Sequence, residues 1–373
     1  QSQADLTLVT AKLGGGGLGY FNPPGTRNEG VGVFNPKGYG WDETSPGTGG
    51  LEQGAYGYIT LIHEFGHALG LAHPHDDGGS STVWEGVTAP FDSFGTFDLD
   101  QGIYTMMSYN DGWQLHPGGE NTEPLFGYEG TLMAFDVAMI QAKYGANTDF
   151  HNANDTYTLP SANALGSYFS CLWDTGGKDK LVCDSTDGAI IDLRAATLGY
   201  DAGSGGYISY VNSIYGGFTI ANGVVIENAG GGSGADDIIG NDARNRLSGG
   251  NGDDTITGGG GRDLLTGGNG ADHFVYLLAS DSIGSARDTI KGFETGSDKI
   301  DLSAVDAQKG GTSHDAFIWL DQGAFNNVRG ELHWRVDGSD VVLEADRNGD
   351  GTADFQILLT GISHLAAADV LLV

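Results

Sequence analysis

The sequence predicts an α+β protein in which a mixed region near the N-terminus precedes a long all-β region. Apolar residues recur at helical spacing over residues 58–69 and again over 132–144. From about residue 150 onward the chain reads as short strands and turns. A β-sandwich-like portion is expected first, then a glycine-rich nonapeptide that repeats five times, and then strands at residues 331–336 and 341–345. We therefore expect two domains, formed by residues 1–149 and 150–373.

The composition predicts bound cations. Of 373 residues, 65 are glycine, 49 are acidic and only 17 are lysine or arginine, so the formal charge is −32. This charge repels nucleic acid and anionic membranes, so neither is expected as a partner. No apolar run approaches the length that spans a bilayer. The same charge opposes compaction unless cations neutralise it.

Short strands and two helices are expected in the first region. Strands are predicted at residues 4–10, 19–22 and 30–34, the last two separated by a Pro-Pro-Gly turn. The first helix covers Tyr58–Leu69. The second covers Leu132–Tyr144 and ends at a glycine.

A cluster of histidines on the first helix has the spacing of a metal site. His63 and His67 are separated by four residues, so their rings project from one face of the helix. Gly70 can adopt the left-handed conformation that ends a helix and turns His73 back toward that face. Three neutral imidazoles are a ligand set of catalytic zinc, and Glu64 is placed to act as a base on zinc-bound water. The short H-E-x-x-H pattern alone could be a polar helix face, but the extended spacing favours zinc.

Two further segments complete a resemblance to the metzincin metallopeptidases, and specifically to the serralysins. Pro74 follows the third histidine directly, and Met107-Ser108-Tyr109 matches the family's methionine turn. The resemblance implies a twisted sheet with a zinc helix and a C-terminal helix. It implies one catalytic zinc bound by His63, His67, His73 and Tyr109, with Glu64 as base. Tyr109 would leave the metal to hydrogen-bond the oxyanion during turnover, while Met107 and Gly70 would be structural.

The resemblance also implies a secreted zinc endopeptidase that acts on proteins and peptides. Tyr20 and Phe21 would belong to the edge strand that pairs with extended substrate. The protein would be a monomer, and a proteinaceous inhibitor would be a further partner. The apolar end Asp369–Val373 resembles an export signal of bacterial type I secretion, with a last core strand as the alternative. Only 62 residues precede His63, fewer than in serralysins, so the N-terminal part of the catalytic domain is expected to be truncated, with a reduced N-terminal lobe as the alternative.

Five consecutive nonapeptides fill residues 231–275. They read GGSGADDII, GNDARNRLS, GGNGDDTIT, GGGGRDLLT and GGNGADHFV. The form G-G-x-G-x-D-x-U-x, with U a large apolar residue, is the calcium-binding repeat (RTX repeat) of a parallel β-roll. A disordered glycine-rich linker is the alternative, but it would lack this register. The inward apolar positions are Ile238, Leu247, Ile256, Leu265 and Phe274.

Several structural calcium ions are expected between repeats n and n+2, held by carbonyl and carboxylate oxygens. The family places side-chain ligands at Asp236, Asp254, Asp263 and Asp272. The second repeat is degenerate and should bind calcium more weakly. The turn positions expected at these sites are Gly232, Gly234, Gly249, Gly250, Asn251, Gly252, Gly258, Gly260, Gly267 and Asn269. The resemblance adds Asp174, Gly176, Gly177, Asp179, Glu227 and Asp288.

The sequence leaves two questions open, namely the state of the two cysteines and an alternative function. Cys171 and Cys183 lie symmetrically about Gly177, so a cross-strand disulfide is favoured over two buried thiols. The alternative function is a non-catalytic calcium-dependent RTX adhesion or surface module with a relict protease lobe. The intact zinc motif favours the enzyme, because a relict would be expected to lose it.

Overall fold

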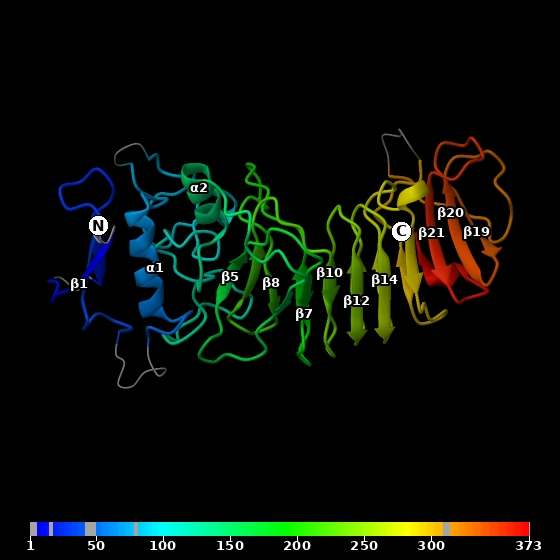
Figure 1. The fold of residues 1–373 in the computed structure, drawn as a ribbon. Coiled ribbons are helices and arrows are strands. Elements are labelled where there is room, and N and C mark those ends of the chain that lie inside the picture. The colour runs from blue at the N-terminus through cyan, green and yellow to red at the C-terminus, as the bar shows by residue number, and fades with distance from the viewer. Residues whose placement is uncertain (1–5, 15–17, 42–49, 78–80, 309–313, 373) are drawn as a thin grey trace. The chain divides into compact units, whose positions relative to one another are not determined.

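The computed structural model describes residues 6–14, 18–41, 50–77, 81–308 and 314–372 (Figure 1). The chain falls into two compact units that alternate along the sequence. Unit 1 consists of Gln1–Asn152, Leu159–Thr175 and Ala195–Val224, and unit 2 of Ala153–Thr158, Gly176–Arg194 and Val225–Val373. The boundary near residue 149 stays a prediction, and each unit is described by itself.

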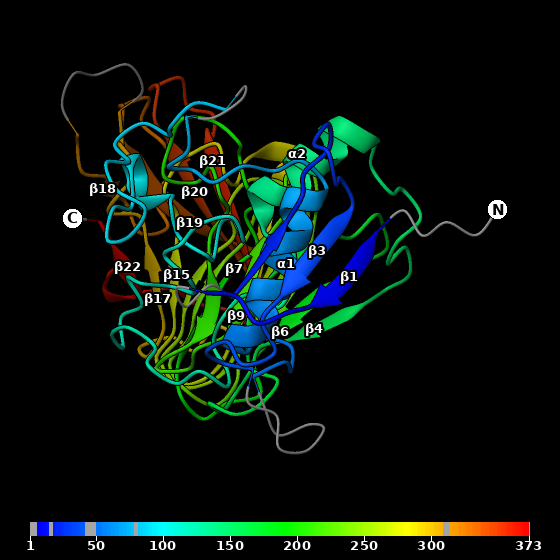
Figure 2. The ribbon, with the colours of Figure 1, turned by 90° about the vertical axis from the view of Figure 1, so that its left-hand side faces the viewer.

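Unit 1 begins with a small sheet against which the first helix packs. The elements are β1 (Thr7–Thr10), β2 (Gly19–Phe21), β3 (Val31–Phe34) and α1 (Tyr56–Ala68). The strand order is β1-β3-β2, with β1 parallel and β2 antiparallel to β3, so β2 lies at an edge. The rings of Phe21 and Phe65 join β2 to α1, and Figure 2 shows α1 beside β3. The predicted strands and helix are thus present, with ends shifted by up to three residues; residues 4 and 5 lie outside the described part.

The second helix supports the C-terminal end of the first. It is α2 (Ala134–Tyr144), followed by Gly145 as predicted. Lys143 Nζ and Tyr144 Oη both donate to the carbonyl of Leu69, at 2.6 and 3.0 Å. This carbonyl lies at the negative end of the α1 dipole, where a cation is favourable. The remaining elements of unit 1 are η1 (Thr96–Asp98), β5 (Phe169–Leu172), β8 (Ser209–Val211) and β9 (Gly217–Ile220).

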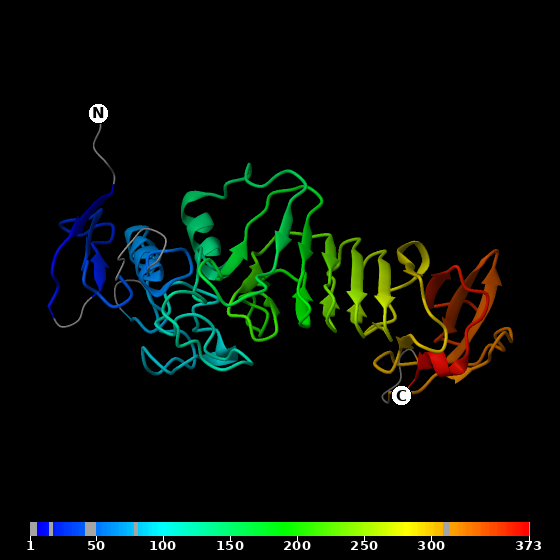
Figure 3. The same cartoon turned by 90° about the horizontal axis from the view of Figure 1, so that it is seen from below.

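Unit 2 is a parallel β-roll of two sheets. One sheet has the order β18-β19-β20-β21-β16-β14-β12-β10-β6-β4, and the other includes β22-β17-β15-β13-β11-β7. Successive turns pair with an offset of two nonapeptides, so that Ile238 is opposite Ile256 and Ile256 is opposite Phe274. All five predicted inward residues are fully buried. Figure 3 shows the green-to-yellow strands of these turns side by side.

The bounds of the unit 2 elements follow in chain order. They are β4 (Thr156–Thr158), β6 (Lys180–Val182), β7 (Ala189–Asp192), β10 (Asn228–Gly230), β11 (Asp237–Ile239), β12 (Arg246–Asn251), β13 (Thr255–Thr257), β14 (Leu264–Asn269), β15 (His273–Val275), η2 (Gly284–Ala286), β16 (Asp288–Lys291), β17 (Lys299–Asp301), β18 (Ile318–Trp319), β19 (Glu331–Asp337), β20 (Asp340–Asp346), β21 (Phe355–Thr360), η3 (Ala367–Asp369) and β22 (Val370–Leu371).

The roll extends upstream of the repeats, where the sequence predicts a β-sandwich-like portion. β4 and β10 both pair in parallel with β6, and β7 pairs in parallel with β11. Leu181 and Ile191 are fully buried at inward positions of these strands. The expected disulfide is wrong, because β5 pairs with β9 while β6 pairs with β4 and β10, so no hairpin joins the cysteines. Cys171 and Cys183 are both buried free thiols.

The C-terminal strands close the roll. β19 and β20 form an antiparallel pair where the sequence predicts strands. β22 pairs in parallel with β17, and Val370 is buried, so the last segment is a core strand. Its role in export stays a prediction, and Val373 lies outside the described residues. Within the described part of the chain, no helix combines the length and apolar character needed to cross a bilayer.

Candidate metal centres

The end of α1 is shaped to return the chain to the histidines. Gly70 has a φ of +82°, the left-handed value expected from the sequence. Its amide donates to His67 O and the amide of Leu71 donates to Gly66 O, both at 2.9 Å. These are the two bonds of a Schellman motif, which ends the helix and reverses the chain within one turn. His73 follows two residues later.

The Nε2 atoms of the three histidines converge on one point. His73 Nε2 lies 3.1 Å from His63 Nε2 and 3.0 Å from His67 Nε2. Each Nδ1 faces an acceptor that carries no proton. The acceptors of His63, His67 and His73 are, in that order, Met106 O at 2.7 Å, Leu71 O at 3.0 Å and Asp76 Oδ2 at 2.5 Å. Each Nδ1 must therefore carry the ring proton, which leaves a lone pair on every Nε2.

This donor set fits zinc. Nitrogen ligands at about 2.0–2.1 Å from a tetrahedral ion lie ~3.3 Å apart, close to the observed spacing. Burial lowers the pKa of His63 to about 3, with His67 and His73 as further causes, and burial also lowers the pKa values of those two rings. Three neutral rings are the form that binds a metal, and their outer hydrogen bonds hold them in place.

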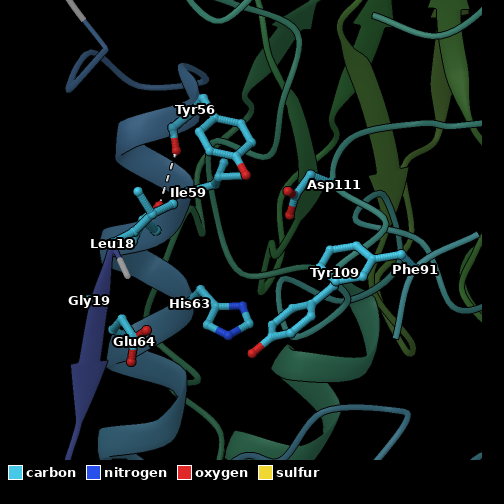
Figure 4. A pocket seen from close by; sticks show the side chains of 10 residues that line it. Leu18, Gly19, Tyr56, Ile59, His63, Glu64, Phe91, Tyr109 and Asp111 are labelled. Atoms are coloured by element: carbon cyan, nitrogen blue, oxygen red, sulfur yellow. Dashed lines mark hydrogen bonds between the residues drawn. The ribbon is translucent and has the colours of Figure 1, made fainter. Parts of the chain in front are cut away.

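Glu64 follows His63 on α1 and has a carboxylate oxygen without a hydrogen-bond partner. Its Oε2 is buried and has no hydrogen-bond partner. Burial raises the pKa of Glu64 to about 7, while a hydrogen bond from the Phe21 amide acts in the opposite direction. Both His63 and Glu64 line a cavity of about 370 Å³, shown in Figure 4. An unpartnered carboxylate oxygen at a cavity wall can accept a proton from a water molecule there.

The methionine turn packs directly beneath the histidine helix. A Cβ at Gly66 would meet Met107 Sδ and lie 2.8 Å from Met106 Cε, so the two methionine side chains pack closely against the helix between His63 and His67. Met107 is 2% exposed. The buried Asp136 of α2 accepts hydrogen bonds from Thr105 Oγ1 at 2.7 Å and from Met106 N at 2.8 Å. Since Met106 O accepts from His63, α2 positions this histidine through the turn.

Replacement of Asp136 by asparagine should weaken metal binding. One oxygen becomes an NH₂ group, and the site then has too few acceptors for the Thr105, Met106 and Met133 donors. We expect about 1–3 kcal/mol of lost stability and roughly tenfold weaker zinc binding. Thermal melting and zinc titration would measure both, with Asp149→Asn on the exposed surface as control. An unchanged zinc affinity would contradict the positioning role.

Tyr109 and two residues that the sequence did not single out surround the histidines. The Tyr109 ring lies 4.6 Å from that of His73, and Figure 4 shows its hydroxyl on the His63 side of the cavity. Burial raises the pKa of Tyr109, and Glu64 adds to this. The His75 ring stacks on the His73 ring, with centroids 4.8 Å apart and an angle of 9° between the ring planes. Asp76 accepts a hydrogen bond from Nδ1 of His73. An aspartate three residues after a ligand histidine could have indicated this second contact.

The aspartates of the roll form two ladders. Oδ1 of Asp254 accepts the amide of Asp236 at 2.8 Å, and Oδ1 of Asp272 accepts the amide of Asp254 at 3.0 Å. On the other ladder, Oδ1 of Asp263 accepts the Asn245 amide, and Oδ1 of Asp288 accepts the Asp263 amide. Asp298 continues the first ladder by accepting the amide of Asp272, and the repeat did not reveal it because 26 residues separate the pair instead of 18.

The second oxygen of four aspartates is buried without a partner. These atoms are Oδ2 of Asp254, Asp263, Asp272 and Asp288. A Cβ at Gly258 would lie 2.7 Å from Asp263 Oδ2, and one at Gly249 or Gly267 would collide with the matching aspartate. These glycines therefore keep space open beside the oxygens of Asp254, Asp263 and Asp272. Buried, unpaired carboxylate oxygens are hard anionic ligands of the kind that calcium binds.

Other predicted calcium residues differ in their partners. Asn245 of the degenerate repeat is satisfied, since its amide donates to Glu227 O and Asn241 Oδ1. Asp236 also uses both oxygens, on the amides of Ala189 and Gly232. The side chains of Asn251 and Asn269 bond to each other, at 2.7 Å.

The remaining calcium positions are Glu227, the site at residues 174–179 and the turn carbonyls. Glu227 Oε2 accepts the amide of Asp179 at 2.8 Å. The site expected at Asp174, Gly176, Gly177 and Asp179 includes residues of both units and stays a prediction. The expected turn carbonyls of Gly232, Gly234, Gly250, Gly252 and Gly260 also remain predicted ligands.

Without calcium, the roll should be stabilised by acid. Burial raises the pKa of Asp254 and Asp263 to about 7 and that of Asp288 to about 8, from an ordinary 3.8. The folded chain then binds protons more tightly than the unfolded chain, so stability is greatest below about pH 4 and is lost as the pH rises toward 8. Calcium-free protein should therefore regain strand signal and a cooperative melting transition at pH 5 that it lacks at pH 8. The same melting behaviour at both pH values, or a transition at pH 8 alone, would contradict the raised pKa values.

Comparison with known protein families shows to which family the chain belongs. The family model for the serralysin C-terminal part of peptidase M10 matches residues 138–372. The chain belongs to the serralysin family. Metallopeptidase AprA of Pseudomonas marginalis is 40% identical over 330 residues, covering 84% of this chain and 63% of that protein. Metalloprotease AprA of Pseudomonas entomophila is 39% identical over 342 residues, covering 88% and 64%, and Serralysin of Photorhabdus luminescens is 40% identical over 280 residues, covering 72% and 53%.

The two kinds of match cover different parts of this serralysin-family chain. The family model begins within α2 and lies outside the histidine motif. The alignment with the Pseudomonas entomophila relative covers 88% of the chain, so it cannot leave out the segment 63–109. The chain nevertheless spans less than two thirds of each of these three relatives. The activity of a whole serralysin therefore does not follow from similarity alone.

Proposed function

We propose that this chain is the catalytic and calcium-binding part of a secreted zinc endopeptidase that hydrolyses peptide bonds in proteins. One observation carries the proposal: His73 Nε2 lies 3.0–3.1 Å from the Nε2 atoms of His63 and His67, and His63 lines one cavity together with Glu64, whose Oε2 is buried and unpartnered. Three neutral histidines with a neighbouring glutamate are the parts that zinc-assisted hydrolysis requires.

Each side chain has a definite role in this reaction. Zinc, when bound by His63, His67 and His73, polarises a carbonyl and lowers the pKa of water. Glu64 takes the proton of the attacking water and passes it to the leaving amine. The Tyr109 hydroxyl, placed at the same cavity, donates to the developing oxyanion. Edge strand β2, with Tyr20 exposed and Phe21 buried, has no described strand on its outer side, where an extended peptide would pair.

Calcium is proposed to complete the folding of unit 2. The four buried carboxylate oxygens of the ladders would each gain a ligand contact when calcium binds. Release by type I secretion to the extracellular space, a monomeric state and a proteinaceous inhibitor remain part of the proposal, through the resemblance to serralysins.

Casein hydrolysis with and without 1,10-phenanthroline, combined with metal analysis, tests the function. We expect about one zinc ion per chain and proteolysis that the chelator abolishes and added zinc restores. Bound zinc without chelator-sensitive cleavage would favour the alternative, a non-catalytic calcium-dependent RTX module. The enzyme is preferred because His63, Glu64, His67, His73 and Tyr109 are all present around one cavity or metal position.

A further inference from the structure

The cavity beside the histidines has two chemically different ends (Figure 4). His63, Glu64 and Tyr109 form one end, where the peptide bond would be cleaved. Tyr56 and Asp111 face each other at the other end. Between them, the wall is apolar and is formed by Leu18, Ile59 and Phe91. At about 370 Å³, the cavity is large enough for a long amino-acid side chain.

The far end of the cavity is acidic and lacks a protein cation. The Asp111 carboxyl group faces the Tyr56 hydroxyl there. A second acid, Glu129, is 1% exposed and interacts electrostatically with Asp111, while its Oε1 accepts the Gly112 amide at 2.7 Å. Among the described residues, neither acid forms an ion pair with a lysine, arginine or histidine.

We propose that this cavity binds a lysine or arginine side chain of the substrate next to the scissile bond, with Asp111 holding its cationic group. The inference rests on the proposed function and names the substrate class of the same site. The chain would then be a protease that cleaves preferentially beside a basic residue.

The shape and charge of the cavity favour a basic side chain over an apolar one. The methylene stem of lysine or arginine can lie along Leu18 and Ile59, while its charged end reaches the carboxylate. An apolar side chain would cover Asp111 without offering it a partner, and burial of an unpaired acid is costly. The net charge of −32 also attracts cationic peptides.

The test compares matched peptides that differ only in charge. The zinc- and calcium-loaded chain would digest a mixed peptide library, and mass spectrometry would map the cleaved bonds. The best peptide would then be remade with citrulline in place of arginine. We expect kcat/KM to fall about tenfold or more with citrulline. In Asp111→Asn the ratio of kcat/KM for the arginine peptide to kcat/KM for the citrulline peptide should approach one. Glu123→Gln, which removes an exposed acid of the same loop, should keep the wild-type ratio.

The outcomes separate the two levels of the proposal. Cleavage with no preference for lysine or arginine, or with equal rates for arginine and citrulline, overturns the role of the cavity and leaves the protease function standing. A preference that persists in folded Asp111→Asn also overturns it. The wild-type comparison decides the question even if that variant does not fold. Absence of any cleavage by zinc-loaded protein overturns both the function and the inference.

Discussion

Replacement of Glu64 by glutamine should abolish peptide hydrolysis while zinc stays bound. The change removes the oxygen that is buried without a partner, and an amide nitrogen cannot accept the proton of water. The glutamine carbonyl can still accept the Phe21 amide, so the local structure is retained. Loss of a general base typically lowers kcat by about 10²- to 10⁴-fold. Steady-state kinetics on a peptide substrate would measure the loss.

Metal analysis of the same variant separates the two roles that a glutamate can have here. The three histidine donors and their hydrogen bonds to Met106, Leu71 and Asp76 are unchanged, so one zinc per chain should remain. Glu123→Gln, which neutralises an exposed carboxyl group, should keep full activity. Loss of zinc from Glu64→Gln would show that Glu64 acts as a ligand and not as the base.

Local spacing was sufficient to predict the histidine cluster. His63 and His67 share a helix face by periodicity alone, and Gly70 with its neighbours forms a turn whose hydrogen bonds all lie within six residues. The same holds for the repeats, because an 18-residue offset fixes which aspartates are neighbours. These features depend on residues close together in the chain, or on strict repetition.

Contacts between residues that are far apart in the chain were either not predicted from the sequence or predicted wrongly. Asp136 reaches the methionine turn from 30 residues away, and no pattern links it to His63. Asp111 and Tyr56 are 55 residues apart in the sequence and face each other only in the folded chain, where the Pro124 carbonyl accepts the Tyr56 amide at 2.9 Å. The cysteine prediction failed for the same reason, since the partners of β5 and β6 are chosen by sheet topology and not by spacing. The upstream turns of the roll carry no repeat, so only three-dimensional pairing reveals them.

Removal of calcium at neutral pH should unfold the roll of unit 2. Each repeat contributes one large inward residue, so the apolar core is thin. Four ladder aspartates keep a buried oxygen without a partner, and a buried unpaired acid is costly. Circular dichroism of calcium-free protein should show loss of strand signal and of a cooperative melting transition. Added calcium should restore both, whereas magnesium should not, because it requires a tighter octahedral site.

A single substitution tests whether the ladder oxygens hold the calcium. Asp254→Asn converts this position to the state found naturally at Asn245, where the side chain finds protein partners instead. The calcium concentration at the folding midpoint should therefore rise by about tenfold, as for loss of one charged contact. Asp337→Asn, at the exposed tip of the β19–β20 hairpin, should leave it unchanged. A spectrum that calcium removal does not alter would mean that hydrogen bonds along the ladders suffice to fold the roll, and that the free oxygens bind no cation.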